Sequence, residues 1–242
     1  MSAINPEPPH VALVTGGGRG IGLALARAFA REGYQVIITG RDEKRLKAAA
    51  RELEKISKAE IEALPCDVRD PASVEKLFTQ VRKQHPAIDV LVNNAGVAHA
   101  WATVEKLSVE TWKQVIDTNL TGTFLVTRAA LPLMRAGSTI VNNLSVAAVK
   151  VFEGMAAYNA SKAGALGFTN VLRQELRKRG IRVLALLPGA TDTEIWEQFW
   201  PDAPRERMVS PETVAQAVLL AVTAPAIAAV EEIRIGPTAG AL

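Results

Sequence analysis

Seven short apolar runs alternate with longer helical patterns along the chain, and this alternation restricts the fold more than any other feature. The runs span residues 11–16, 35–40, 61–66, 88–94, 138–145, 181–189 and 231–236. They are rich in Val, Ile and Leu without strict alternation, which is typical of strands covered on both faces. Repeated strand–helix–strand units with right-handed crossovers predict an α/β fold with a doubly wound parallel sheet of about seven strands and helices on both faces.

The segments between the runs carry apolar residues at helical spacing. One such set is Val74, Leu77, Phe78 and Val81, and another is Trp112, Val115, Ile116 and Leu120. No repeat, low-complexity tract or charged linker divides the chain, so we expect a short flexible tail over residues 1–9 and one domain over residues 10–242. In such a sheet a ligand binds beyond the carboxyl ends of the strands, near the topological switch point.

The composition limits the chemistry. Hydrophobic residues make up 48% and charged residues 22% of 242 residues, as in a soluble globular protein. The single cysteine, Cys66, excludes an internal disulfide and a cysteine-based zinc site, and the three histidines are scattered without ligand spacing. We therefore expect no metal site.

The net charge, the longest apolar stretch and the first ten residues indicate which partners and which location to expect. The formal net charge is only +3, and the basic residues interleave with acidic ones, which argues against nucleic-acid binding. The longest apolar stretch, residues 217–230, is broken by Pro225 and falls short of the roughly 20 residues that a membrane span needs. The first ten residues lack the features of a secretion signal, so we expect a cytoplasmic protein.

A glycine-rich turn, "TGGGRGIG" (15–22), follows the first run. Gly16, Gly20 and Gly22 let the backbone turn tightly, and a helix opening near Ile21 would aim its N–H groups at a pyrophosphate. The spacing differs from the common GxGxxG fingerprint. A plain tight turn is the alternative interpretation.

The end of the second run, "IITGRDEKR", indicates the cofactor type. NAD sites usually place an acidic residue here to hold the ribose 2′-hydroxyl, whereas an arginine accommodates a 2′-phosphate. Arg41, together with Arg19 of the glycine-rich turn, favours NADP over NAD. Two alternatives stay open: Asp42 reaches the ribose if the strand ends one residue later, or Arg41 is a surface residue at a helix start.

Two more runs end in short motifs. Asp67 of "CDVRD" can accept a hydrogen bond from the adenine amino group while Val68 packs on the ring, although an Asp before a helix is more often a cap. In "NNAG", Asn93 is expected to tie neighbouring strands together. The residues expected against the cofactor ribose are Asn94, Ala95 and Gly96. An Asn/Gly turn is the alternative.

The stretch "YNASK" places Tyr158 four residues before Lys162, on one face of a predicted helix that ends at Gly180. An ordinary tyrosine has a pKa near 10, and a nearby ammonium together with an oxidised nicotinamide would favour its phenolate. Ser145 ends the fifth run, so its hydroxyl is expected in the same crevice, where it can hold a carbonyl oxygen.

The motifs "TGGGRGIG", "CDV", "NNAG", "TNLTG", Ser145, "YNASK" and "PGATDT" follow one another in this order. In this combination the chain resembles a classical short-chain dehydrogenase/reductase (SDR), a family with a Rossmann-type fold, from about residue 10 to the last strand. The resemblance implies direct hydride transfer between a nicotinamide and a carbonyl or alcohol carbon, without a metal.

The resemblance also implies roles for single residues. Tyr158 is the proton donor or acceptor, Lys162 binds the nicotinamide ribose and lowers the tyrosine pKa, and Ser145 positions the substrate carbonyl. Asn119 corresponds to the family's catalytic asparagine, whose backbone holds a water in the proton relay. The segment that holds the nicotinamide comprises Pro188, Gly189, Thr191 and Thr193. Arg19 and Arg41 match the NADP-preferring pattern.

The chain departs from the family pattern at two places. Leu144 replaces the first of the two serines that commonly end the fifth strand, and the chain ends "IRIGPTAGAL" where the family usually has Asp-Gly-Gly. Subunit contacts by the tail are therefore not carried over, although the long helices still imply a homodimer or homotetramer.

Aromatic and apolar residues near the motifs predict the substrate class. The candidates for lining a largely apolar pocket are His99, Trp101, Phe152, Met155, Trp196, Phe199 and Trp200. We expect an NADP(H)-dependent reductase of a hydrophobic or aromatic ketone or aldehyde. The alternatives are a 3-oxoacyl-thioester reductase of the acyl-carrier-protein type and an NADP-sensing binding protein without turnover.

Overall fold

The computed structural model describes residues 10–57, 59–225 and 227–240, so the tail predicted over residues 1–9 lies outside the described residues. The seven apolar runs form one sheet with the strand order β3-β2-β1-β4-β5-β6-β7, and each pair of neighbouring strands is parallel. The strands are β1 Val11–Thr15, β2 Gln35–Gly40, β3 Ile61–Pro65, β4 Val90–Asn93, β5 Thr139–Asn143, β6 Arg182–Pro188 and β7 Glu232–Ile235. The predicted parallel α/β fold is confirmed, with strands slightly shorter than the apolar runs.

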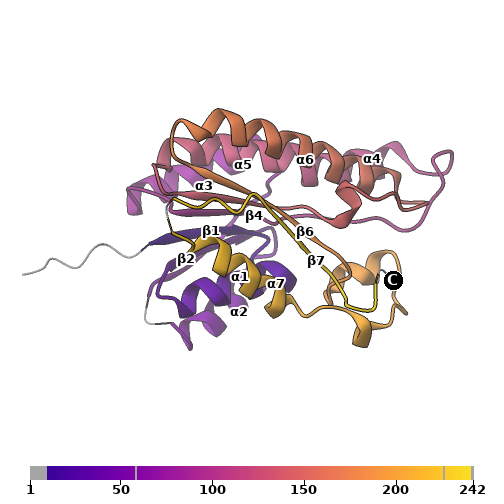
Figure 1. Ribbon diagram of the computed structural model, residues 1–242, viewed down its shortest axis with the longest axis horizontal. Helices are drawn as coiled ribbons and strands as arrows, with labels where there is room; N and C mark the ends of the chain where they lie inside the picture. Colours follow the sequence, from indigo (N-terminus) through magenta and orange to yellow (C-terminus); the bar gives the residue numbers. More distant parts are fainter. Residues whose placement is uncertain (1–9, 58, 226, 241–242) are drawn as a thin grey trace, which may run out of the picture.

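Helices cover both faces of the sheet (Figure 1). On one side lie α1 Gly20–Arg31, α2 Glu43–Glu54 and α7 Pro211–Val222, and on the other lie α3 Pro71–Gln84, α4 Val109–Ile116, α5 Gly122–Ala130 and α6 Ala156–Arg177. Within the described part of the chain, none of these helices is both long and apolar enough to cross a bilayer.

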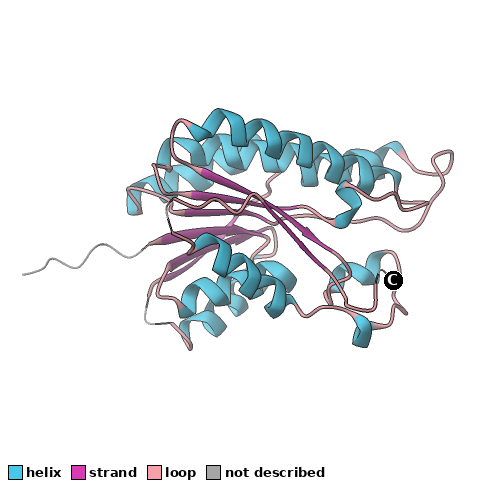
Figure 2. Cartoon of the chain, viewed as in Figure 1, coloured by secondary structure: helices cyan, strands magenta, loops and turns pink. Residues whose placement is uncertain are grey.

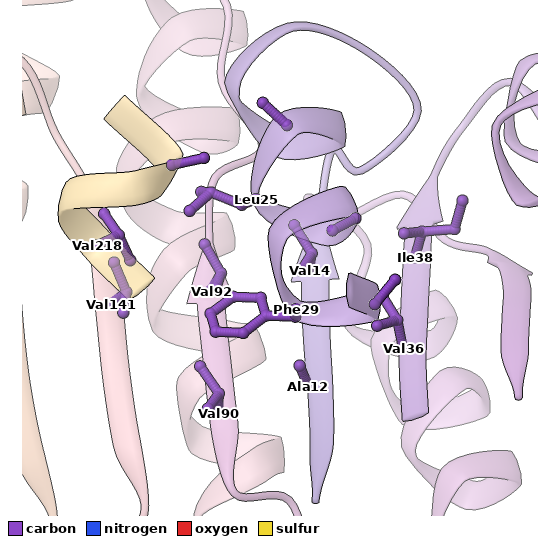
Figure 3. Packing of buried hydrophobic residues seen from close by; sticks show 14 of the residues in the cluster. Ala12, Val14, Leu25, Phe29, Val36, Ile38, Val90, Val92, Val141 and Val218 are labelled. Carbon is purple, nitrogen blue, oxygen red and sulfur yellow. The ribbon is translucent and has the colours of Figure 1, made fainter. Parts of the chain in front are cut away.

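The core on the first face is built around α1. Its Leu25 and Phe29 point onto the sheet between Val14 and Val92, and Val218 of α7 packs beside them (Figure 3). Each of these side chains is fully buried. Because full burial of such a side chain contributes about 1.5–3 kcal/mol, this cluster holds α1 and the glycine-rich turn that precedes it against β1.

The opposite face follows the predicted helical spacing in α3 and departs from it in α4. Val74, Leu77, Phe78 and Val81 are all buried, as their spacing predicts. In contrast, Trp112 is 41% exposed. The expected apolar stripe through Trp112 to Leu120 is not continuous, because α4 ends at Ile116 and a π-helical turn, Asp117–Thr121, turns the following residues relative to it.

The strand order fixes where a ligand can bind. The chain moves outward from β1 through β2 to β3 and then returns to β4 on the other side of β1. This reversal opens a crevice at the carboxyl ends of β1 and β4. Two short 3-10 helices, Glu194–Gln198 and Arg205–Arg207, lie beyond the carboxyl end of β6 (Figure 2).

Candidate functional site

A cleft of about 1100 Å³ opens at the carboxyl ends of the strands. The predicted site residues that line it are Gly16, Arg19, Gly20, Ile21, Arg41, Asp67, Val68, Asn94, Ala95, Gly96, Ser145, Tyr158, Lys162, Pro188, Gly189, Thr191 and Thr193. Gly22 and Asn119 are not part of its lining and lie behind it. The structure therefore brings the separated motifs of the sequence to one cleft.

The glycine-rich turn connects β1 to α1. Gly16 and Gly20 have φ angles of 65° and 52°, a region that favours glycine. A Cβ on Gly22 would lie 2.3 Å from the Gly16 carbonyl oxygen, so only glycine allows the turn to close on the helix. The helix begins at Gly20, and its N-cap Arg19 makes no side-chain capping bond, which leaves the first N–H groups facing the cleft. This geometry suits an anionic phosphate.

Asn94 locks this turn to the neighbouring strand. Its Nδ2 donates to the carbonyl oxygens of Thr15 at 2.9 Å and Gly16 at 3.2 Å. In return the Thr15 hydroxyl oxygen accepts from the backbone N–H groups of Asn94 at 2.9 Å and Ala95 at 3.0 Å. The asparagine thus faces the turn, and the ends of β1 and β4 are held together at the switch point.

Asn93, one residue earlier, points to the other face of the sheet. Its Nδ2 donates to Thr127 Oγ1 at 2.9 Å and to Asn142 Oδ1 at 2.8 Å. The predicted role of Asn93 in tying strands together is confirmed.

The outer end of the cleft carries free cations. Arg19 and Arg41 are exposed, and neither forms an ion pair within residues 10–57, 59–225 and 227–240. Asp42 is the N-cap of α2, where its carboxylate accepts from the Arg45 N–H at 2.9 Å. The cap holds Asp42 at the start of α2, while the guanidiniums of Arg19 and Arg41 favour a phosphate at this end of the cleft. Arg45 also lines the cleft, a position that sequence reasoning missed because it depends on where α2 begins.

Asp67 and Val68 follow β3 at the edge of the cleft. The guanidinium of Arg69 binds the Asp67 carboxylate through Nε at 3.0 Å and Nη2 at 2.6 Å, which lowers the pKa of that carboxyl. The carboxylate remains an acceptor with spare lone pairs, as an adenine amino group requires. Val68 is buried against Gly122, where a Cβ would lie 2.7 Å from the valine side chain.

The residues expected to carry the reaction lie together in the inner part of the cleft. Lys162 Nζ donates to the Asn143 carbonyl oxygen at 3.0 Å and lies 5.6 Å from the centre of the Tyr158 ring. Ser145 lies close enough to the Tyr158 hydroxyl to oppose, by hydrogen bonding, the rise in the pKa of the phenol. The helix that carries the pair begins at Ala156 and ends at Arg177, three residues before the predicted end at Gly180.

Burial controls the proton affinities of this group. It raises the pKa of Tyr158, and the bond with Ser145 opposes the increase only in part. It also lowers the pKa of Lys162 to about 8. The lowered tyrosine pKa expected from the sequence is thus absent in the protein alone, because desolvation of the phenolate outweighs its stabilisation.

Asn119 lies in the π-helical turn and is 3% exposed. Its side-chain Nδ2 donates to the Val97 carbonyl at 2.9 Å and to Ser161 Oγ at 3.0 Å, and its Oδ1 accepts from the Val97 N–H at 2.9 Å. Its backbone carbonyl accepts from the Thr123 hydroxyl at 2.9 Å. The residue therefore ties the loop that follows "NNAG" to the helix of Tyr158.

The segment after β6 closes the cleft from the other side. Thr193 packs on the glycine-rich turn, where a Cβ on Gly20 would lie 3.1 Å from its methyl group. Arg205 holds this segment through Nη1, which donates to Asp192 Oδ1 at 2.8 Å and to the Thr193 carbonyl at 2.7 Å. Thr191 is held by its own hydroxyl, which donates to the Gly189 carbonyl at 3.1 Å.

Most of the residues predicted for an apolar pocket line the cleft. They are Trp101, Phe152, Met155, Trp196, Phe199 and Trp200. Trp101 lies flat against Gly154, since a Cβ there would approach its indole to 2.1 Å. His99 does not line the cleft: it is 6% exposed, and its Nδ1 bonds with the Ala100 carbonyl at 2.7 Å.

Comparison with known proteins agrees with this geometry. The model of the family described as short chain dehydrogenase matches residues 10–204. A putative ketoacyl reductase from Streptomyces coelicolor is 38% identical, over 88% of this chain and 89% of its own. An uncharacterized oxidoreductase from Staphylococcus saprophyticus is 34% identical, over 94% and 97%.

Solved structures resemble the whole fold. An alcohol dehydrogenase from Thermococcus sibiricus, complexed with 5-hydroxy-NADP, has a TM-score of 0.87 at 29% identity and covers 97% of this chain and 99% of its own. A variant of actinorhodin polyketide ketoreductase with NADPH has a TM-score of 0.84 at 33% identity, over 94% and 95%. The chain belongs to the short-chain dehydrogenase family.

Proposed function

We propose that this protein is an NADP(H)-dependent oxidoreductase that catalyses reversible hydride transfer between the nicotinamide and a carbonyl or secondary alcohol substrate. The observation that carries the proposal is the convergence of Ser145, Tyr158 and Lys162 in the same cleft as the glycine-rich turn. A tyrosine hydroxyl, a serine hydroxyl and an ammonium form a set that can move a proton and stabilise the charge left behind.

The contacts support the following role for each residue in the reaction. NADPH, when bound, supplies the hydride that a carbonyl carbon accepts. Ser145 holds the carbonyl oxygen, Tyr158 donates its hydroxyl proton to that oxygen, and the Lys162 ammonium stabilises the resulting phenolate. In the oxidative direction the phenolate takes the proton from the alcohol.

The cationic end of the cleft supports NADP. Arg19 and Arg41 can bind a 2′-phosphate, and each charge-assisted hydrogen bond contributes about 1.5–3 kcal/mol. Structural relatives have been solved with NADP or NADPH, among them a serine dehydrogenase complexed with NADP+, which is 32% identical with a TM-score of 0.85. The pyrophosphate would lie at the start of α1, and the nicotinamide ribose beside Lys162.

The apolar wall of the cleft supports a hydrophobic or aromatic ketone or aldehyde as substrate. Trp196 lies 4.7 Å from Phe199 and 6.1 Å from Trp200, measured between ring centres, so three aromatic rings form one surface. Trp101 faces the cleft from the loop after β4. Planar apolar groups pack well against such surfaces.

Reduction of a 3-oxoacyl thioester is the second candidate. The observations that favour it are the ketoacyl reductase and the polyketide ketoreductase among the relatives. A regulatory protein that binds NADP without turnover is the non-enzymatic alternative, which the set of Ser145, Tyr158 and Lys162 argues against.

We also propose that the protein is a homodimer or homotetramer. Phe124 of α5 is 42% exposed and Val171 of α6 is 53% exposed, so these two helices carry apolar surface outward. Light scattering during size-exclusion chromatography measures the assembly.

A spectrophotometric screen of NADPH oxidation tests the proposed activity. The panel should contain aromatic and aliphatic ketones and aldehydes, small charged carbonyls and an acetoacetyl thioester. Turnover of the apolar carbonyls supports the main proposal, and turnover of the thioester alone supports the second candidate. NADPH binding without turnover of any member would support the non-enzymatic alternative.

A further inference from the structure

The tripeptide "VNN" occurs twice, at residues 92–94 and 141–143, and the two copies end neighbouring strands. Asn93 of β4 pairs in register with Asn142 of β5. Because successive side chains point to opposite faces of a sheet, the four asparagines form two rows. Asn93 and Asn142 face α5 and α6, where Asn142 Nδ2 donates to Thr169 Oγ1 at 2.9 Å. The second row, Asn94 and Asn143, faces the cleft.

The cleft-side row is a continuous chain of hydrogen bonds. Asn143 Nδ2 donates to Asn94 Oδ1 at 2.8 Å, and Asn94 Nδ2 donates to the carbonyl oxygens of the glycine-rich turn. At the other end, the Asn143 backbone carbonyl accepts from Lys162 Nζ at 3.0 Å. The partners are all carbonyl oxygens, so the orientation of both amides is determined by chemistry.

The side chain of Asn143 carries a cost in folding free energy at this position. Its Oδ1 is buried and has no hydrogen-bond partner among the described residues, and a buried acceptor without a partner carries a desolvation cost. An apolar side chain at the end of β5 would avoid that cost. The amide is therefore better explained by what it holds than by the packing it provides.

We propose that Asn143 is a positioning residue, which fixes the carbonyl that orients the Lys162 ammonium and links that lysine to the glycine-rich turn through Asn94. The inference rests on the proposed function, because the lysine matters to catalysis only if Tyr158 transfers a proton. Tyr158 is the titratable neighbour of Lys162. Gly96, which approaches the Lys162 ammonium from the loop after β4, is uncharged, and so is Asn119, which lies beside Gly96.

Asn143→Leu tests the proposal, because it keeps the approximate volume and removes the donor to Asn94. We expect kcat for carbonyl reduction to fall about tenfold, which corresponds to about 1.4 kcal/mol, with little change in the KM of the carbonyl. An ammonium that is held less firmly stabilises the phenolate less. The rise of alcohol oxidation with pH should therefore move to higher pH.

The matched control is Thr169→Val, which removes the acceptor of the other amide row without touching Lys162. It should lower stability while the pH profile stays at its wild-type position. If Asn143→Leu likewise lowers only stability and leaves kcat and the pH profile unchanged, the positioning role is refuted.

A readout without turnover separates this inference from the proposed activity. The pKa of Lys162 can be followed in the protein without cofactor by NMR of its ε-methylene group, assigned by loss of the signal in Lys162→Arg. Loss of a well-placed acceptor should lower that pKa in Asn143→Leu but not in Thr169→Val. This outcome supports the positioning role even if the carbonyl screen fails, and an unchanged lysine pKa in both variants overturns it.

Discussion

The ammonium of Lys162 lies 5.6 Å from the centre of the Tyr158 ring, one helical turn further along α6. The two groups are therefore neighbours before any cofactor binds. Burial raises the pKa of Tyr158 and lowers that of Lys162 to about 8, so at neutral pH the phenol is protonated and the lysine still carries most of its charge. The phenolate formed by proton transfer is therefore stabilised by the Lys162 ammonium and by what enters the cleft.

Replacement of Tyr158 by Phe should abolish carbonyl reduction while NADPH binding is retained. The variant lacks the hydroxyl proton but keeps the ring and the position of Lys162. Turnover is measured by NADPH absorbance and binding by NADPH fluorescence. Near-normal turnover in this variant would refute the assignment of Tyr158 as the acid.

Arg41→Ala should weaken NADPH binding by about tenfold or more, or about 1.4 kcal/mol, and leave NADH binding nearly unchanged. The reason is that Arg41 would contact the phosphate found only in NADPH. Lys44→Ala is a matched control, because Lys44 is an exposed cation of the same α2 start that does not line the cleft. Equal losses for both cofactors would remove the phosphate-binding role.

Lys162 should make the stability of the protein without cofactor depend on alkaline pH. Its folded pKa of about 8 lies below the unfolded value near 10.4, so the unfolded state binds the extra proton between these values. The free energy of unfolding should therefore rise as pH increases from about 8 to about 10. Below about pH 8 the cost of burying the charged lysine should stay constant.

Lys162→Met isolates this contribution by removing the titrating group. The variant should be more stable than the wild type at pH 7, lose that advantage near pH 10, and show no turnover. Urea unfolding at both pH values measures the difference. A wild type and a variant with parallel pH dependence would show that Lys162 is not desolvated.

Gly22→Ala should weaken both NADPH and NADH and lower the melting temperature, because its Cβ would lie 2.3 Å from the Gly16 carbonyl. Gly167→Ala is the matched control: it is a helical glycine of α6 with no atom within 4 Å of the added Cβ. That substitution should stabilise the protein by about 0.5–1 kcal/mol. Calorimetry and cofactor titration test both variants.

Trp101→Ala should reduce discrimination in favour of aromatic carbonyls. The indole is 56% exposed at the cleft and rests on Gly154, so its removal takes away a flat apolar wall. We expect KM to rise for aromatic ketones and to change little for small aliphatic ones. An equal change for both classes would place Trp101 outside the substrate site.

The sequence predicted the parts of the site that depend on strand ends. Each apolar run became a strand, and parallel strands bring their carboxyl ends to one edge, so Arg41, Asn94 and Ser145 could be placed without coordinates. The bounds were less accurate, because a run such as 138–145 contains the residues that leave the sheet after Asn143.

Other features of the site could not be predicted from the spacing of residues in the sequence, because they depend on three-dimensional contacts. The π-helical turn around Asn119 has no signature in residue periodicity, and neither has the exposure of Trp112. The raised pKa of Tyr158 depends on how completely its hydroxyl is desolvated, which spacing from Lys162 cannot give. The bond between Asn94 and Asn143 joins residues 49 positions apart.

Gly40, the last residue of β2, is a position where a substitution could change the cofactor preference. A Cβ on Gly40 would meet nothing closer than the Leu46 side chain at 3.7 Å, so the backbone there accepts a side chain without a clash at Cβ. Because Asp42 already caps α2, Gly40 is another position at this strand end where a carboxylate for a ribose diol could arise. Replacement of that glycine by an acidic residue is thus one route by which the cofactor preference of this protein could shift from NADPH towards NADH.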